Sequence, residues 1–283
     1  MHIIEAIILG LVQGLTEFLP ISSSAHIRIV GILLPSQEDP GATFTAITQI
    51  GTELAVLVFF WTKIVRIIKQ WALSLVGKVP RNDPEARMGW LVIVASIPIG
   101  VLGFTLQDYI REPFRNLWLV AAVLIVFGLI LGAADRFSAR KLDEADVTYP
   151  QGITVGVAQA LALIPGVSRS GATTTAARLF GFKRTTAAEF SFLMAIPAVL
   201  GSGLFEVVHG LENADAGPYG WSGVIIATVV AFLVGWAVIA YLMRYLERGS
   251  FMPFVIYRVV LGVVLMILLG AGVLEPFAND AAA

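Results

Sequence analysis

Cysteine is missing from this sequence, and charged side chains are scarce. None of the 283 residues is a cysteine, so disulfide bonds, thiolate zinc sites and cysteine nucleophiles are excluded. Charged residues make up 14% of the chain and hydrophobic residues 57%, whereas soluble domains carry about 25% charged and about 45–50% apolar residues. The 19 basic and 20 acidic side chains nearly cancel, so no overall field attracts nucleic acid. A soluble enzyme, a coiled coil, a disordered chain and a nucleic-acid-binding protein are all excluded.

Long apolar runs take the place of the missing charge. A helix needs about 20 apolar residues to cross a bilayer. Two apolar stretches, 3–34 and 153–181, are interrupted in the middle by proline, serine and a charged residue. Uninterrupted segments of the required length lie at about 44–62, 88–106, 117–135, 187–208, 221–243 and 252–274. We therefore predict an all-α polytopic membrane protein with six transmembrane helices and two re-entrant, broken-helix segments.

Basic residues are distributed unevenly between the predicted loops. Fourteen of the 19 Lys and Arg residues lie in the loops after the first, third and fifth spans. The opposite side has only Arg28, Arg111 and Arg115. Because cytoplasmic loops carry the excess of basic residues, we predict that both termini lie outside.

The two interrupted stretches resemble each other, about 146 residues apart. The matching positions are Gly10, Gln13 and Pro20 in the first, and Gly156, Gln159 and Pro165 in the second. Each copy precedes three spans, and an odd number of spans inverts the second copy relative to the first. We predict a single membrane domain over 1–283, built from an inverted repeat of about 1–136 and about 150–275. Irregular backbone within a bilayer needs protein or water around it, so both interruptions are expected to share one polar cavity.

The first interruption begins with two polar residues on one helix face. Gln13 and Glu17 are four residues apart, and Pro20 then ends the helix. A carboxylate within a membrane is costly and indicates function.

Serines and a histidine follow this break. Ser22, Ser23 and Ser24 can cap a new helix, whose free N–H groups suit a phosphate. His26 lies about one turn further on, and Ser23 and His26 together offer a nucleophile and a general base. The simpler interpretations are a helix cap for the serines and a bond to a backbone carbonyl for His26.

The second interruption offers one fixed cation and several small polar groups. The planar guanidinium of Arg169 suits bidentate phosphate binding, and its simpler role is an ion pair with Glu17 that joins the two repeats. The neighbouring candidates for substrate binding are Ser168, Ser170, Gly171 and Thr173.

Three more polar residues lie within predicted spans. Gln49 and Glu53 are four residues apart on the first span, and we expect Gln49 to face the cavity and Glu53 to lie deeper. Arg258, on the last span, is expected to reach the membrane interface or to pair with an acidic side chain.

The two interruptions resemble the signature motifs of a known family. Gln-Gly-Leu-Thr-Glu-Phe-Leu-Pro-Ile-Ser-Ser-Ser-Ala-His and Pro-Gly-Val-Ser-Arg-Ser-Gly-Ala-Thr are similar to the two motifs of bacterial undecaprenyl-diphosphate phosphatases of the bacitracin-resistance (BacA) type. The resemblance extends over essentially the whole chain. It implies an enzyme of the bacterial cytoplasmic (inner) membrane that hydrolyses undecaprenyl diphosphate to the monophosphate and inorganic phosphate. That reaction recycles the lipid carrier for peptidoglycan and other envelope polymers, and it confers bacitracin resistance.

The resemblance also assigns roles to residues. It maps the acidic motif to Gln13 and Glu17, the serine–histidine part to Ser23 and His26, and the phosphate-binding arginine to Arg169. It implies a divalent metal ion, Mg²⁺ or Ca²⁺. Many relatives have a second glutamate where this chain has Gln13, so Glu17 and the substrate's own phosphates would hold most of the ion.

Alternatives remain open at this point. We expect Ser23 to attack with His26 as its base, but a mechanism in which His26 activates water or attacks directly uses the same residues. A secondary transporter or lipid-carrier flippase also fits an inverted repeat. A nucleophile and base opposite Arg169 favour chemistry, because transport needs no nucleophile. The expected partners are the polyprenyl diphosphate and membrane lipid, without nucleic acid, and a homodimer is left open.

Overall fold

The computed structural model describes residues 2–36, 40–105, 116–139, 141–212 and 218–277. Their regular structure is helical, and no strand occurs within these ranges. Arg111 and Arg115, which entered the count of basic residues, fall outside the described residues.

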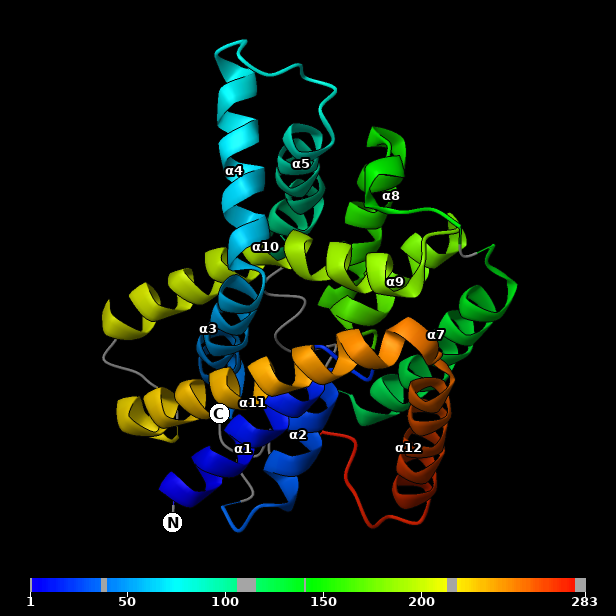
Figure 1. The fold of residues 1–283 in the computed structure, drawn as a ribbon. Helices are drawn as coiled ribbons and strands as arrows, with labels where there is room; N and C mark the ends of the chain where they lie inside the picture. Colours follow the sequence, from blue (N-terminus) through cyan, green and yellow to red (C-terminus); the bar gives the residue numbers. More distant parts are fainter. Residues whose placement is uncertain (1, 37–39, 106–115, 140, 213–217, 278–283) are drawn as a thin grey trace.

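Figure 1 shows the described helices, coloured in chain order. They are α1 (His2–Thr16), α2 (Ser23–Leu33), α3 (Gly41–Phe59), α4 (Trp61–Leu75), α5 (Pro84–Thr105), α7 (Leu117–Phe137), α8 (Tyr149–Ala160), α9 (Arg169–Leu179), α10 (Arg184–Glu212), α11 (Gly220–Arg248) and α12 (Met252–Gly270), with short 3₁₀ turns η2 (Glu144–Asp146) and η3 (Leu161–Leu163).

The long apolar helices match the predicted membrane spans. Five of the described helices, α5, α7, α10, α11 and α12, are long and apolar enough to cross a membrane. The consecutive helices α3 and α4 pass the same test as a pair that is bent by 80°. The prediction of an all-α polytopic membrane protein is therefore confirmed.

The first predicted span needs a correction. The segment 44–62 is not one straight helix, because α3 ends at Phe59 and α4 starts in a new direction at Trp61. Near the start of α4, Lys63 forms ion pairs with Glu144 and Glu189.

Each interrupted stretch is a pair of helices with a break between them. The break separates α1 from α2 in the first stretch and α8 from α9 in the second. Of the described residues other than glycine, only Ser22 and Ser168 have a positive φ, 74° and 71°, and each directly precedes the second helix of its pair. Each hydroxyl also meets the hydroxyl two residues later, at 3.2 Å for Ser24 and 3.1 Å for Ser170. The two breaks therefore share a local conformation.

Each interrupted stretch packs on a helix from the other half of the chain. The helix α1 runs along α11, as Figure 1 shows, and α8 lies against α5. Glycine permits both approaches: a Cβ on Gly10 would lie 2.6 Å from the carbonyl oxygen of Ala227, and one on Gly156 would lie 2.5 Å from that of Ala95. This crossed packing brings the two breaks to the centre of the molecule.

A buried aspartate joins four elements behind the site. Asp135, near the end of α7, accepts hydrogen bonds from Arg178 of α9 at 3.1 Å and from Arg184 of α10 at 2.8 Å. Its Oδ2 also accepts from the backbone N–H of Phe251, just before α12, at 3.2 Å. This network fixes the ends of helices that carry site residues.

Candidate active site

The two breaks meet at the carboxylate of Glu17. Its Oε2 accepts hydrogen bonds from Gln13 Nε2 at 2.7 Å and from Ser23 Oγ at 2.6 Å. Its Oε1 accepts from Arg169 Nη2 at 2.6 Å. Gln13 lies one turn before Glu17, while Ser23 and Arg169 are the first residues of α2 and α9. The structure thus brings four predicted site residues, from both interruptions, into one buried network.

His26 has other partners than the Ser23 hydroxyl. Its Nδ1 lies 2.7 Å from the carbonyl oxygen of Ser22, and its Nε2 lies 2.7 Å from the hydroxyl of Tyr257 on α12. A carbonyl can only accept, so Nδ1 carries the proton and Nε2 accepts one from Tyr257. In the described chain no hydrogen bond joins His26 to Ser23, so the expected pair is not formed.

The hydroxyls of the second break form hydrogen bonds with backbone groups. Ser168 caps α9 by accepting from the N–H of Gly171 at 3.1 Å, and Thr173 donates to the carbonyl of Arg169 at 2.8 Å. Ser170 donates to the carbonyl of Leu19 at 3.2 Å, which ties the second break to the first. These bonds shape the site rather than leaving free hydroxyls.

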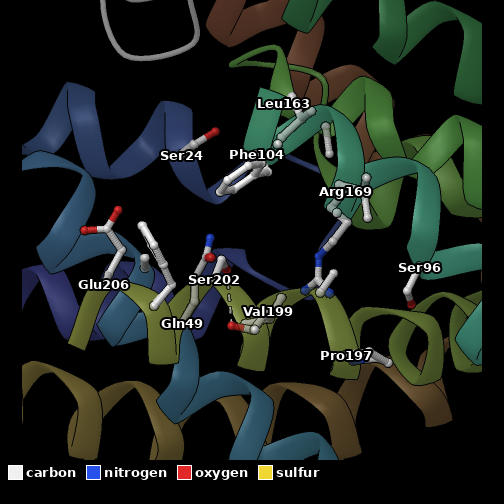
Figure 2. A pocket seen from close by; sticks show the side chains of 18 of the residues that line it. Ser24, Gln49, Ser96, Phe104, Leu163, Arg169, Pro197, Val199, Ser202 and Glu206 are labelled. Carbon is white, nitrogen blue, oxygen red and sulfur yellow. Dashed lines mark hydrogen bonds between the residues drawn. The ribbon is translucent and has the colours of Figure 1, made fainter. Parts of the chain in front are cut away.

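A cavity of about 730 Å³ opens beside this network. Of the predicted site residues, Glu17, Ser22, Ser23, Ser24, Gln49, Ser168 and Arg169 line it, whereas Ser170, Gly171 and Thr173 do not. Figure 2 shows Arg169 extending into the cavity, with Gln49 and Glu206 at the other end. The remaining wall comes mainly from apolar and small residues of α5 and α10. The cavity therefore combines polar and charged side chains with an apolar wall from α5 and α10.

Two glycines shape the apolar groove. Gly100 of α5 and Gly201 of α10 both line the cavity, and a Cβ at either position would meet no atom within 4 Å. The space beside these two positions is therefore open to an apolar chain.

Arg258 binds backbone carbonyls. The expectation that it reaches the membrane interface or pairs with an acidic side chain is therefore wrong. Its side chain is fully buried, and its hydrogen bonds go to backbone carbonyls rather than to an acidic side chain. It donates to the carbonyl oxygens of Leu124, Pro20 and Gly166, at 3.2, 3.1 and 2.8 Å. The carbonyls of Pro20 and Gly166 lie in the two helix breaks and lack helical donors, whereas that of Leu124 lies within α7. Arginine offers five N–H groups in a fixed fork that reaches all three. An arginine in an apolar span that follows two proline breaks is the signal that could have found this role.

Buried oxygens without hydrogen-bond partners occur on Glu53 and Gln13. Glu53 Oε2 lies 3.8 Å from Arg169 Nη1, and within the described chain neither atom has a hydrogen-bond partner. Gln13 Oε1 is likewise buried without one. No group of three or more His, Asp or Glu side chains is arranged to hold a metal ion in the described part of the chain. A magnesium ion suits such a site, because it binds one or two carboxylates and takes other ligands from phosphates and water.

Comparison with known proteins places this geometry in a family. The model of the family described as "Bacitracin resistance protein BacA" matches residues 6–264, which include both breaks. The chain belongs to the BacA family.

Individual BacA relatives match over nearly their whole length. The undecaprenyl-diphosphatase of Clavibacter michiganensis subsp. michiganensis is 61% identical over 272 residues, covering 96% of this chain and 98% of the relative. That of Micrococcus luteus is 57% identical over 273 residues, covering 96% and 99%. Undecaprenyl-diphosphatase 2 of Streptomyces avermitilis is 53% identical over 292 residues, covering 98% of each chain. The family resemblance stated from the two motifs is confirmed.

Proposed function

We propose that Glu17, Ser23 and Arg169 form the phosphatase centre of this chain, which hydrolyses undecaprenyl diphosphate to undecaprenyl phosphate and inorganic phosphate. The BacA family match and the relatives named undecaprenyl-diphosphatase support the reaction. The observation that carries the site is the Ser23 hydroxyl, held at 2.6 Å on Glu17 in a cavity that Arg169 also lines. The activity recycles the lipid carrier for peptidoglycan synthesis and fits the bacitracin resistance in the family's name.

The polar and apolar walls of the cavity suit the two parts of the substrate. The prenyl chain lies in the apolar groove between α5 and α10, and the diphosphate lies at Arg169. The N-termini of α2 and α9 both start at the site, and their free N–H groups favour an anion there. Arg169 lines the cavity, and its planar guanidinium suits a phosphate there.

Ser23 is the proposed nucleophile and Glu17 the acceptor of its proton. As Ser23 Oγ bonds to the terminal phosphorus, the bond from that phosphorus to the bridging oxygen breaks and undecaprenyl phosphate leaves. Water then attacks the phosphoserine, which releases inorganic phosphate and returns the proton to Ser23. Arg169 and the helix N-termini stabilise the charge that spreads over the transferred phosphoryl group.

The expectation from the sequence that His26 is the base for Ser23 requires a rearrangement of the His26 ring. Both ring nitrogens already have partners, the Ser22 carbonyl and the Tyr257 hydroxyl. The observed geometry favours a positioning role, in which His26 and Tyr257 hold the start of α2.

A divalent cation, Mg²⁺ or Ca²⁺, forms part of the proposal. Glu17 and Gln13 would hold it together with oxygens of the substrate. When bound, it supplies positive charge that neutralises the leaving phosphate.

The placement in the membrane is also proposed. We place the chain in the bacterial inner membrane with both termini outside, and we divide it into inverted repeats of about 1–136 and about 150–275. The matching φ angles of Ser22 and Ser168 and the crossed packing of α1 and α8 support the repeat. Labelling of single cysteines introduced at the termini of this cysteine-free chain measures their side, and light scattering in detergent measures whether the chain forms a homodimer.

Phosphate release by the purified protein tests the function. We expect turnover of undecaprenyl diphosphate that EDTA abolishes and that both Glu17→Ala and Arg169→Ala remove. A folded wild-type protein that releases no phosphate overturns the phosphatase proposal in favour of a transporter or flippase, because a transporter needs no hydrolysis.

A further inference from the structure

Glu53 is the most deeply buried acidic side chain next to the proposed centre. It lies on α3, one turn after Gln49, whose side chain lines the cavity. Its own side chain is 0% exposed and approaches Arg169 from the side opposite Glu17, at Nη1 rather than Nη2. Glu17 and Glu53 thus flank the two terminal nitrogens of one guanidinium.

The carboxylate of Glu53 lacks the bonds that normally accompany burial. Neither of its oxygens has a hydrogen-bond partner in the described chain, and the nearest cation, Arg169 Nη1, lies 3.8 Å away. Burial of a carboxylate is costly unless it is paired and hydrogen-bonded. Glu53 must therefore bind a proton or a further cation.

The charge balance at Arg169 favours a cation. When Glu53 is ionised, Glu17 and Glu53 together carry two negative charges against the single positive charge of Arg169. The other arginine nearby, Arg258, directs its donors to three backbone carbonyls. A diphosphate brings further negative charge into this buried place, so positive charge has to enter with it.

Among the polar side chains at the centre, Glu53 has the oxygens that are free to bind such a cation. Both oxygens of Glu17 already accept hydrogen bonds, from Gln13, Ser23 and Arg169. Gln13 is neutral, and its Nε2 is bonded to Glu17, which leaves its Oε1 as one further ligand. Mg²⁺ and Ca²⁺ both prefer such oxygen ligands.

We propose that Glu53 supplies the second carboxylate of the divalent-cation site in this chain. It supplies a carboxylate where the neutral side chain of Gln13 offers only an amide oxygen. The proposal rests on the phosphatase function proposed above for the same centre.

Binding of Mn²⁺ to the purified protein, followed by the electron paramagnetic resonance of free Mn²⁺, tests the proposal without substrate or turnover. Glu53→Gln keeps the shape of the side chain and is expected to weaken Mn²⁺ binding at least about tenfold. Loss of a residue that only hydrogen-bonds to a metal ligand already lowers metal affinity by about that factor. The matched control is Glu5→Gln. Glu5 is also buried and has one oxygen without a partner, but it lies at the other end of α1, and its variant is expected to bind as the wild type does.

A second substitution, at position 13, replaces the negative charge that is lost at position 53. Adding Gln13→Glu to the Glu53→Gln variant is expected to recover most of the Mn²⁺ affinity. Wild-type affinity in a folded Glu53→Gln variant overturns the proposal and leaves Glu53 as a protonated acid. Turnover that resists EDTA in a protein that binds no Mn²⁺ also overturns it, while the phosphatase function stands. A wild type that binds Mn²⁺ through Glu53 but releases no phosphate supports the cation site and overturns only the function.

Discussion

The hydroxyl of Ser23 donates a 2.6 Å hydrogen bond to Oε2 of Glu17, across the break between α1 and α2. The break makes this contact, since a continuous helix would carry the two side chains, six residues apart, to different faces. The carboxylate is buried, so the bond to Ser23 is not shared with bulk water. The contact gives the serine a proton acceptor before any substrate arrives.

We predict that a phosphoserine at position 23 accumulates on rapid quenching with substrate labelled in its terminal phosphate. Ser23→Ala removes the nucleophile and should abolish both the label and phosphate release. Glu17→Gln should lower kcat about 10²–10⁴-fold, the range of general base catalysis. Quench-flow followed by mapping of the labelled peptide measures these effects.

Two variants separate this mechanism from its rival. His26→Gln should still form the phosphoserine with a smaller loss of rate, because the ring of His26 faces Ser22 and Tyr257. Ser24→Ala, one residue beyond the nucleophile, should also retain the label. Phosphohistidine at position 26, or normal phosphate release by the Ser23→Ala variant, contradicts the prediction.

Arg258→Lys is expected to lower both thermal stability and kcat. Lysine cannot reproduce the three-way fork to Leu124, Pro20 and Gly166. Each buried carbonyl left without a donor costs about 1–3 kcal/mol. The melting temperature in detergent and the rate of phosphate release measure the effect. Arg248→Lys, at an exposed arginine at the end of α11, is the control, and equal behaviour of the two variants contradicts the assigned role.

Gly201→Leu is expected to discriminate between long and short prenyl diphosphates. A leucine there projects into the groove that we assign to the tail, and forcing extra methylenes into occupied space costs about 1–3 kcal/mol. The kcat/KM for undecaprenyl diphosphate should therefore fall about tenfold, while that for farnesyl diphosphate falls less. Val101→Leu, at a lipid-facing position of α5 outside the cavity, should change neither value. An equal fall for both substrates would place the tail elsewhere.

Asp135→Asn is expected to destabilise the fold. The substitution removes the charge that Arg178 and Arg184 share, and breaking a buried ion pair on one side costs about 3–5 kcal/mol. Asp143→Asn is the matched control, since its ion pair with Lys183 is exposed and worth at most about 1 kcal/mol. Denaturation in mixed micelles compares the two variants, and a similar stability for both contradicts the role given to Asp135.

The helices and the two breaks could be predicted from the sequence because local signals determine them. Apolar runs, prolines and serine caps act within a few residues, so α5, α7 and the starts of α2 and α9 lie close to the predicted places. The bend between α3 and α4 could not be found by hydropathy alone, because the apolar run continues through it.

Side-chain partners at the site were harder to predict, because they come from distant parts of the chain. A spacing of three residues suggests that Ser23 and His26 meet, but Tyr257 of α12 binds the ring instead. Arg258 and Glu53 could be singled out as costly charges. Only the tertiary packing shows their neighbours, which are the two helix breaks for Arg258 and Arg169 for Glu53.

The close approach of Gly10 to Ala227 sets an order for the biogenesis of the enzyme. Chains are made from the N-terminus, so α1 enters the membrane long before the helix on which it finally rests. The helices α1 and α2 are therefore synthesised before α11, on which α1 packs. The carbonyl of Pro20, in the break between them, gains its bond from Arg258 only once α12 has been made. The last of the described helices therefore supplies the side chain that binds the backbone of both breaks.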